Sequence, residues 1–312
     1  MTYFGRAYLI SAWAALTLAQ GVQAEEVQAR AGLRERIAER LQYSQGELDT
    51  YRARSKPTAT VSYGNDPNQR FDVYAGNRSA NAPVIFMVHG GGWKRGDKGM
   101  SGVVDNKFER WGPKGIVFIS ANYRLLPKTD PYAQAEDIAR AVAKAQTEAA
   151  RWGADPKRFV LMGHSAGAHL VALLAVSPDM QRKFGVIPPV ATVSLDSGTL
   201  NTVETMEGRH FDLHDAAFGK DGAFWVKTSP WHALKEKPAP LLSVCSTRRA
   251  DACPQAQQLA DKIHSYGGIG EVLREDLAHG EINKNLGLPG PYTDAVEAFL
   301  RKADPALAER LR

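Results

Sequence analysis

A serine between two glycines is the clearest sign of chemistry in this sequence. Ser165 follows an apolar run, residues 159–162, and precedes an Ala-, Leu- and Val-rich segment that continues to Val176. This order predicts a strand, a very tight turn and a helix, with the serine at the apex of the turn. Gly163 and Gly167 have no side chains, so the strand and the helix can pass close together. A serine presented in this way is typical of a nucleophile.

A second motif could supply the hydrogen-bond donors that such a nucleophile needs. His89 is followed by three glycines and comes directly after an apolar run, residues 84–88. Attack by a serine on a carbonyl group leaves negative charge on the carbonyl oxygen, and preorganised N–H groups stabilise that charge. We expect the N–H groups of Gly91, Gly92 and Ala166 to form this oxyanion hole.

Four stretches of the sequence resemble the α/β-hydrolase superfamily, in particular its acetyl-esterase/lipase-like branch, which includes hormone-sensitive-lipase-like enzymes. Residues 89–98 (HGGGWKRGDK), 121–125 (ANYRL) and 155–158 (DPKR) look like that branch. Residues 163–170 (GHSAGAHL) also look like kynurenine formamidase-type members. The resemblance covers about residues 59–300. It implies an α/β fold with a mostly parallel eight-stranded sheet flanked by helices, and a serine hydrolase that uses no metal or organic cofactor.

The general base is expected after the last strand of such a fold, because the order in this family is serine, acid, histidine. His279 comes just beyond the strand predicted at residues 271–274 and is followed by a glycine. The other histidines do not follow the final predicted strand. We therefore expect the neutral imidazole of His279 to take the Ser165 proton and later return it to the leaving group.

Two aspartates compete for the role of the acid that orients His279. Asp251 follows the strand predicted at residues 241–244, which is the usual place for the acid in this family, so Asp251 is the preferred candidate. Asp196 follows the preceding predicted strand and stays open as the alternative, since a few hydrolases use that earlier position.

The elements that must position these residues follow from the hydrophobic pattern. Residues 59–63 and 71–74 alternate apolar and polar side chains around a turn, which predicts an antiparallel hairpin at a sheet edge. Residues 84–88 and 116–120 are continuous apolar runs, as expected for strands covered on both faces. Strands and helices alternate along the remaining chain, which predicts a mostly parallel sheet with its site at the carboxyl ends of the strands.

Residues 197–237 lie between two predicted strands and are expected to form a small cap over the site. They contain more aromatic side chains than a solvated loop would, namely Phe211, Phe218, Phe224, Trp225 and Trp231. Trp93 and His164, which adjoin the two motifs, are expected to line the substrate pocket. His210 and His214 are spaced for one face of a helix, but a third ligand at a convincing spacing is missing, so we predict no metal site.

The first 24 residues have the pattern of a signal peptide. Arg6 precedes an apolar run, residues 7–19, and residues 22–24 (VQA) offer a small-x-small cleavage site. The run is too short to span a bilayer comfortably, so we expect no stable membrane anchor and a periplasmic or secreted protein. Residues 25–58 are charged and helical in pattern, and residues 59–312 are predicted to form the hydrolase domain.

Export would place the two cysteines in an oxidising compartment. Cys245 and Cys253 lie close together in the sequence, so we predict a disulfide between them, with two buried thiols as the alternative. A disulfide here would bracket Asp251 and stiffen the loop that carries it.

Composition limits the class of partner. The chain has 312 residues, of which 44% are hydrophobic, so it can bury one large core. Its net charge is +5, but the Lys and Arg residues are scattered among acidic residues and form no basic stripe with aromatics. We therefore expect a small-molecule partner and no nucleic acid.

The sequence thus predicts an exported serine hydrolase that cleaves small carboxylic esters with short acyl chains. Hydrolysis of an aryl formamide or another amide is the second hypothesis. The third is a catalytically inactive binding member of the same fold. The presence of the nucleophile, the base and both oxyanion elements argues against that third hypothesis.

Overall fold

A computed structural model describes residues 52–76 and 80–312, and these residues belong to one compact unit. The predicted signal peptide and most of the charged segment at residues 25–58 lie outside the described residues. The predicted helix does not continue into the part of that segment that is described, residues 52–58. Arg52 instead forms an isolated β-bridge with Met100, and the Arg54 amide donates to Asp105 Oδ1 at 2.9 Å.

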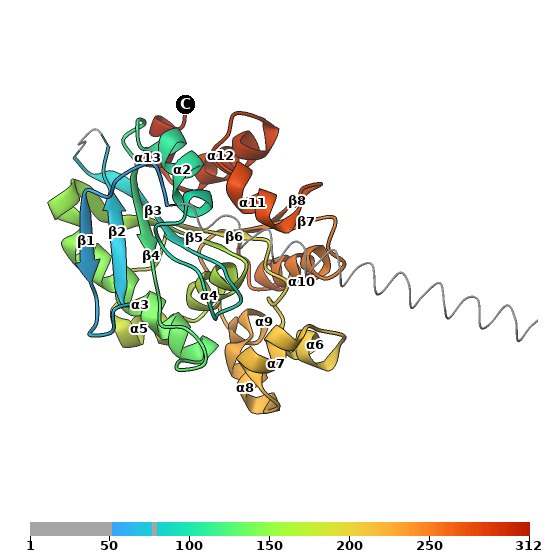
Figure 1. The fold of residues 1–312 in the computed structure, drawn as a ribbon. Helices are drawn as coiled ribbons and strands as arrows, with labels where there is room; N and C mark the ends of the chain where they lie inside the picture. Colours follow the sequence, from blue (N-terminus) through green and yellow to red (C-terminus); the bar gives the residue numbers. More distant parts are fainter. Residues whose placement is uncertain (1–51, 77–79) are drawn as a thin grey trace, which may run out of the picture. The chain divides into compact units, whose positions relative to one another are not determined.

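Eight strands of the described chain form one sheet, in the order β1-β2-β4-β3-β5-β6-β7-β8 (Figure 1). The strands are β1 (Ala59–Ser62), β2 (Arg70–Tyr74), β3 (Ala82–Val88), β4 (Val117–Ala121), β5 (Ala154–His164), β6 (Ala191–Leu195), β7 (Leu241–Ser246) and β8 (Gly270–Glu275). Strands β1, β2 and β4 pair in antiparallel fashion, and all other neighbours are parallel. The predicted edge hairpin and mostly parallel sheet are confirmed.

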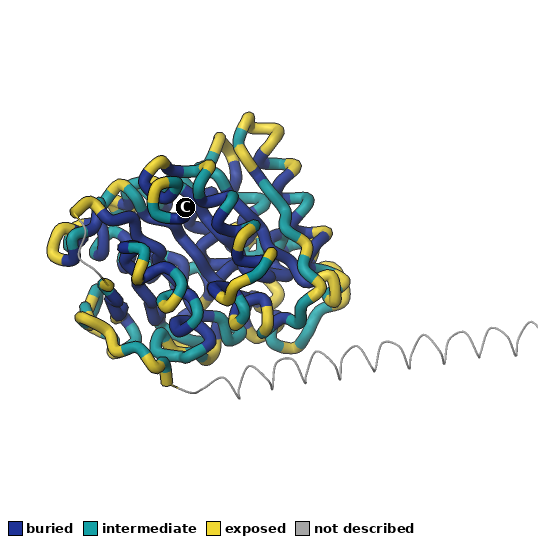
Figure 2. Tube along the Cα trace, turned by 90° about the horizontal axis from the view of Figure 1, so that it is seen from above, coloured by how far each residue is buried: buried dark blue, intermediate teal, exposed yellow. Residues whose placement is uncertain are grey.

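Strand β3 shows why helices must cover both faces of the sheet. All seven of its residues are buried. Val84 and Phe86 belong to one core cluster, whereas Ile85 and Met87 belong to another, because successive side chains in a strand point to opposite faces. Figure 2 shows the buried strands inside a shell of partly exposed helices.

The helices divide between the two faces of the sheet. The first face is covered by α3 (Pro131–Glu148), which a 3-10 turn (Ala149–Trp152) extends, and by α4 (Ala166–Ala175), α5 (Pro178–Phe184) and α10 (Ala252–Ser265). The second face is covered by α2 (Ser101–Trp111), α11 (His279–Asn285), α12 (Pro291–Ala303) and α13 (Pro305–Arg310). Among the described residues, none of the helices combines the length and the apolar character needed to cross a membrane.

Four short helices fill the excursion between β6 and β7, as the gold ribbons in Figure 1 show. They are α6 (Thr202–Glu207), α7 (Asp212–Phe218), α8 (Gly222–Thr228) and α9 (Pro230–Ala233). Phe218 is buried, and the centre of its ring lies 4.9 Å from that of Trp93. This aromatic contact packs the excursion onto the loop that follows β3.

Besides His279, four histidines are buried in the described part of the chain: His89, His164, His169 and His214. Burial lowers the pKa of each, to about 4 for His169 and to about 3 for His214. The hydrogen bonds of His169 fit a neutral ring, because its Nδ1 accepts from Trp93 Nε1 at 3.3 Å and its Nε2 lies 2.7 Å from the Thr228 carbonyl oxygen.

The predicted disulfide is present between Cys245, near the end of β7, and Cys253, in the first turn of α10. The two Cα atoms are 5.1 Å apart, and both side chains are buried. The bond therefore closes the short loop at residues 246–252, which lies beside the carboxyl end of the sheet.

Reduction of this disulfide should lower the melting temperature. Loop-closure entropy for a ring of this size corresponds to roughly 2–3 kcal/mol of stability, or a shift of about 5–10 °C for a domain of this size. Calorimetry with and without a phosphine reductant measures the shift. The Cys245→Ala/Cys253→Ala protein is the control, and the reductant should leave its melting temperature unchanged. A wild-type protein that melts at the same temperature in both buffers would contradict the stabilising role.

The buried histidines should also make the protein acid-sensitive. In the unfolded chain a histidine gains its proton near pH 6.5, whereas folded His169 and His214 do so only near 4 and 3. Between these limits the unfolded state binds more protons, so stability falls as the pH falls, by about 1.4 kcal/mol per pH unit for each histidine. Urea unfolding between about pH 6 and about pH 5 measures this slope.

The variant that isolates one histidine in this experiment is His214→Phe, because the His214 ring already packs against Phe211 and Phe218. The slope should decrease by about 1.4 kcal/mol per pH unit in this variant, whatever its absolute stability. The same slope in both proteins would show that His214 does not contribute.

Candidate active site

The parallel strands end at one edge of the sheet, and the predicted catalytic residues follow those ends. The register pairs Val88 of β3 with Gly163 of β5, His164 of β5 with Leu195 of β6, and Ser246 of β7 with Glu275 of β8. Because neighbouring strands end at the same level, the residues that follow them meet above this edge.

Ser165 stands at a tight turn between β5 and α4, as the sequence predicts. Its φ of 55° is in the left-handed region, which costs a residue with a side chain roughly 1–3 kcal/mol. Its amide donates to the Leu195 carbonyl oxygen at 2.9 Å. A Cβ atom on Gly163 would collide with the carbonyl group of Gly167, and one on Gly167 would collide with that of Val88. The two glycines are therefore required by close backbone contact.

The glycine-rich loop packs directly on the serine turn. A Cβ atom on Gly90 would lie only 2.9 Å from Ser165 Cβ, so glycine is required here as well, although Gly90 is not one of the expected oxyanion donors. Gly91 and Gly92 have φ values of 113° and 60°, which other residues rarely adopt. On the outer side of the loop, Leu213 of α7 lies 3.8 Å from where a Cβ of Gly92 would be. The loop thus lies between the serine turn and α7.

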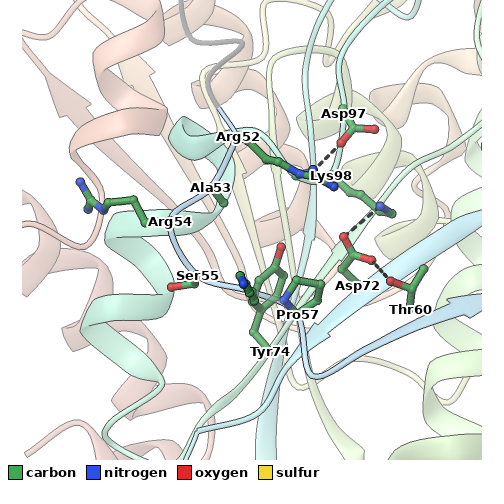
Figure 3. Close-up of a pocket in the computed structure, with 12 residues that line it drawn as sticks. Arg52, Ala53, Arg54, Ser55, Pro57, Thr60, Asp72, Tyr74, Asp97 and Lys98 are labelled. Atoms are coloured by element: carbon green, nitrogen blue, oxygen red, sulfur yellow. Dashed lines mark hydrogen bonds and ion pairs between the residues drawn. The ribbon is translucent and has the colours of Figure 1, made fainter.

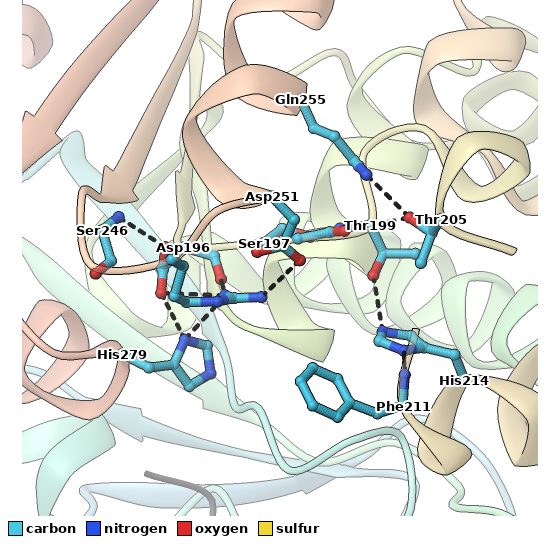
Figure 4. Close-up of polar contacts among 12 residues, drawn as sticks. Asp196, Ser197, Thr199, Thr205, Phe211, His214, Ser246, Asp251, Gln255 and His279 are labelled. Carbon is cyan, nitrogen blue, oxygen red and sulfur yellow. Dashed lines mark hydrogen bonds and ion pairs between the residues drawn. The ribbon is translucent and has the colours of Figure 1, made fainter. Parts of the chain in front are cut away.

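His279 is paired with a carboxylate through its Nδ1 atom. His279 begins α11, and its Nδ1 lies 2.6 Å from Asp196 Oδ2 (Figure 4). Asp196 is fully buried, and its Oδ1 accepts the Ser246 amide at 2.8 Å. A carboxylate only accepts hydrogen bonds, so the imidazole donates through Nδ1–H. Nε2 is then the nitrogen that can accept a proton.

The pKa of Asp196 is far below its usual range. Burial alone would raise this pKa, but the charge of Arg249 and the hydrogen bonds from His279 and the Ser246 amide outweigh burial. The carboxylate is therefore ionised at every pH at which an imidazole changes its charge.

The preference for Asp251 as the partner of His279 is wrong in this geometry. Asp251 Oδ2 instead accepts from Arg249 Nη2 at 3.1 Å, and the Asp251 side chain is 37% exposed. The physical reason is the position of each strand end. Asp196 follows β6, whose last residue pairs with the residue before Ser165, whereas Asp251 lies farther along the chain, at the start of α10. The alternative in the sequence, Asp196, holds the imidazole.

Arg249 is the residue of this cluster that the sequence did not single out. Its Nη1 donates to the Asp196 carbonyl oxygen at 2.9 Å and to Asp196 Oδ2 at 3.2 Å. Two arginines, Arg248 and Arg249, stand side by side in the loop after β7, and the sequence offers no signal that separates them. In the structure Arg248 turns outward and bonds Asp276 Oδ1 at 2.8 Å.

Trp93 and His164, which the sequence places in the substrate pocket, are both buried. Trp93 is 3% exposed and packs its ring edge-on against His169 and Phe218. His164 Nε2 donates to the His279 carbonyl oxygen at 2.9 Å, and the two rings lie 4.5 Å apart. Because His164 directly precedes Ser165, this hydrogen bond links His279 to the serine turn.

His210 and His214 form hydrogen bonds with different partners. His210 Nε2 is 3.3 Å from Asp215 Oδ1, whereas His214 accepts the Phe211 amide through Nδ1 at 3.3 Å. Within residues 52–76 and 80–312, His, Cys, Asp and Glu side chains form no group of three or more that could hold a metal ion.

A pocket of about 480 Å³ lies against the antiparallel edge of the sheet (Figure 3). Its lining comes from the segment before β1, from β1 and β2, and from the turn before α2, namely residues 52–57, Thr60, Asp72, Tyr74 and residues 97–99. An ion pair of 2.9 Å between Lys98 and Asp72 crosses it. Ser165, Asp196 and His279 do not line this pocket, so it is separate from the candidate active site.

Comparison with known proteins adds relatives that carry esterase names. The BD-FAE family model matches residues 71–211. Esterase LipC of Mycobacterium tuberculosis is 30% identical over 139 residues, which are 44% of this chain and 34% of LipC. Kynurenine formamidase of Danio rerio is 30% identical over 152 residues, which are 48% of this chain and 49% of that protein. The matched segments thus span half or less of these curated relatives.

Solved structures share the fold over most of the chain. Esterase 2 of Thermogutta terrifontis superposes with a TM-score of 0.63 at 20% identity and covers 83% of this chain and 97% of its own. A truncated carbohydrate esterase from gut microbiota superposes with a TM-score of 0.66 at 18% identity and covers 82% of this chain and 98% of its own.

The strand order, the left-handed serine between β5 and α4, and the shared fold lead to one assignment. The chain has the α/β-hydrolase fold, and its residues 71–211 resemble the BD-FAE family of esterases.

Proposed function

We propose that this protein is a serine hydrolase that cleaves carboxylic esters through an acyl-enzyme. The observation that carries the proposal is the buried 2.6 Å pair of His279 Nδ1 and Asp196 Oδ2 at the same sheet edge as the strained Ser165. A nucleophile on a sharp turn, an oriented imidazole and a glycine-rich loop together are the parts that acyl transfer requires.

In the proposed mechanism, Ser165 Oγ attacks the ester carbonyl carbon while His279 takes the serine proton. Because Nδ1 is bonded to Asp196, the proton goes to Nε2. The imidazolium then gives this proton to the departing alcohol. Water attacks the acyl-serine in the second half, with His279 again as base, and releases the acid.

The oxyanion hole is proposed at the N–H groups of Gly91, Gly92 and Ala166. Two features support this proposal. Gly90 has no side chain, so the glycine-rich loop lies directly against Ser165. Ala166 is the first residue of α4, and its amide therefore has no carbonyl partner within the helix. Backbone donors fixed in this way need no reorganisation when the negative charge develops.

A short acyl chain is the proposed preference. The cap helix α7 places Leu213 close to Gly92, and Trp93, His169 and Phe218 fill the space beneath with packed rings. In Figure 4 the Phe211 ring extends from the cap toward the side on which His279 lies. Such surroundings favour a small acyl group over a long one.

Hydrolysis of an aryl formamide is the second candidate function. Two observations favour it, namely the GHSAGAHL form of the serine motif and the match to the Danio rerio kynurenine formamidase. A formyl group is also small, and the same residues would attack it.

Export is part of the proposal. The signal-peptide pattern before residue 25 lies outside the described residues, so its support comes from elsewhere in the chain. The Cys245–Cys253 disulfide is that support, because structural disulfides persist in oxidising compartments. We therefore propose a periplasmic or secreted enzyme whose partner is a small ester.

The nucleophile and the substrate class can be tested together. The wild-type protein should turn over p-nitrophenyl acetate faster than N-formylkynurenine, and Ser165→Ala should lower both rates by at least about 10³-fold. A fluorophosphonate probe should label the wild type at Ser165 and leave Ser165→Ala unlabelled. A folded wild type that resists the probe would overturn the enzyme assignment. A faster reaction with N-formylkynurenine would make the aryl formamide the preferred substrate class.

Substitution of Asp196 should lower kcat/KM far more than substitution of Asp251. Asp196→Asn should lower kcat/KM for p-nitrophenyl acetate by roughly 10³–10⁴-fold, because the amide would favour the wrong tautomer of His279. Asp251→Asn should cost less than about tenfold, because the Asp251 carboxylate pairs with Arg249 rather than with His279. Near-UV circular dichroism of both variants checks that they fold. A larger loss in Asp251→Asn would return the role of the acid to Asp251.

A further inference from the structure

The Arg249 guanidinium is packed directly against the His279–Asp196 pair. Its Nη1 is 3.2 Å from Asp196 Oδ2 and also 3.2 Å from His279 Nδ1, and the Arg249 side chain is 10% exposed. An arginine stays protonated at every pH at which a protein is folded. The structure therefore holds a permanent cation beside the imidazole.

Three features keep this guanidinium in place. Its Nη2 donates to Asp251 Oδ2 at 3.1 Å. Its loop is closed by the Cys245–Cys253 disulfide. Gly198 leaves room for it, since a Cβ atom there would collide with the guanidinium and with the Asp251 carboxylate. These features hold the cation at one defined position, unlike the charge of a surface side chain.

The contact between Arg249 and His279 is not an ordinary hydrogen bond. His279 Nδ1 carries the hydrogen that points to Asp196, and a guanidinium has donors only, so two N–H groups face each other. Such a contact penalises a second positive charge on the ring. The same guanidinium attracts the Asp196 carboxylate, so its effect on the two partners is opposite in sign.

Among residues 52–76 and 80–312, the other charged and titratable groups around His279 have partners of their own. They are His164 at the end of β5, which donates to the His279 carbonyl oxygen; Glu281 of α11 and Asp276, which pair with Arg248; Asp251, which pairs with Arg249; and Lys107 of α2, which donates to the Asn283 carbonyl oxygen. Arg249 is the cation that the described residues place within 3.2 Å of the ring.

We propose that Arg249 is a positioning residue that keeps Asp196 ionised and disfavours a second positive charge on the His279 ring. The inference rests on the proposed esterase function and adds a residue to it. With Arg249 in place, the imidazolium formed during the reaction lies 3.2 Å from a second cation, so it gives its proton more readily to the leaving group.

The pH dependence of kcat/KM tests this role. In Arg249→Gln the acid limb of the profile for p-nitrophenyl acetate should move to higher pH by about one unit, because loss of the cation makes protonation of the ring easier. Arg249→Lys keeps the charge and should keep the limb close to its wild-type position. Arg248→Gln is the matched control, since Arg248 is the neighbouring arginine and bonds Asp276 on the surface.

A purely structural role would lower kcat at all pH values and leave the acid limb in place, and that result would overturn the inference. If Arg249→Gln does not fold, Arg249→Met removes the same charge with similar volume and carries the same expectation. Fluorophosphonate labelling of Ser165 in the wild type distinguishes failure of the Arg249 role from failure of the proposed esterase function. A labelled, active wild type with an unmoved limb in the variant refutes only the role of Arg249, whereas an unlabelled wild type refutes the esterase function itself.

Discussion

The buried charge of Asp196 is the constraint on which the candidate active site depends. A carboxylate withdrawn from water is costly unless hydrogen bonds and opposite charge compensate it. Here the compensation comes from His279 Nδ1–H, the Ser246 amide and the Arg249 guanidinium. These groups belong to the start of α11, the end of β7 and the loop that follows β7. The three segments therefore have to meet at the end of β6, and the parallel register of the sheet brings them there.

The strained backbone of Ser165 is a second constraint, because the surrounding contacts have to hold it in that conformation. The turn closes only because glycines at positions 163 and 167 let the strand, the helix and the end of β3 approach one another. Gly90 brings the glycine-rich loop against the serine in the same way. A rigid sheet, buried on both faces, is what holds a non-glycine residue at φ 55°. Stability of the fold and presentation of the nucleophile are thus linked.

Much of this arrangement could be predicted from the sequence. The hydrophobic runs indicate the strands and their parallel order, and the two glycine motifs indicate the serine turn and the loop beside it. The position of His279 after the last strand follows from chain order. Chain order cannot choose between Asp196 and Asp251, because it does not say which strand end lies nearer to His279. It also cannot separate Arg248 from Arg249, because the orientation of each side chain depends on contacts with α10, α11 and β6.

The proposed mechanism requires that Ser165 is acylated during turnover. Rapid quenching of the wild-type protein with p-nitrophenyl acetate, followed by peptide mass spectrometry, detects such an acyl-enzyme. We expect an acetyl group on the peptide that contains Ser165, formed within the first turnover and lost as the acyl-enzyme is hydrolysed. Release of p-nitrophenol with no acetyl group on Ser165, or with the acetyl group on another residue, would contradict it.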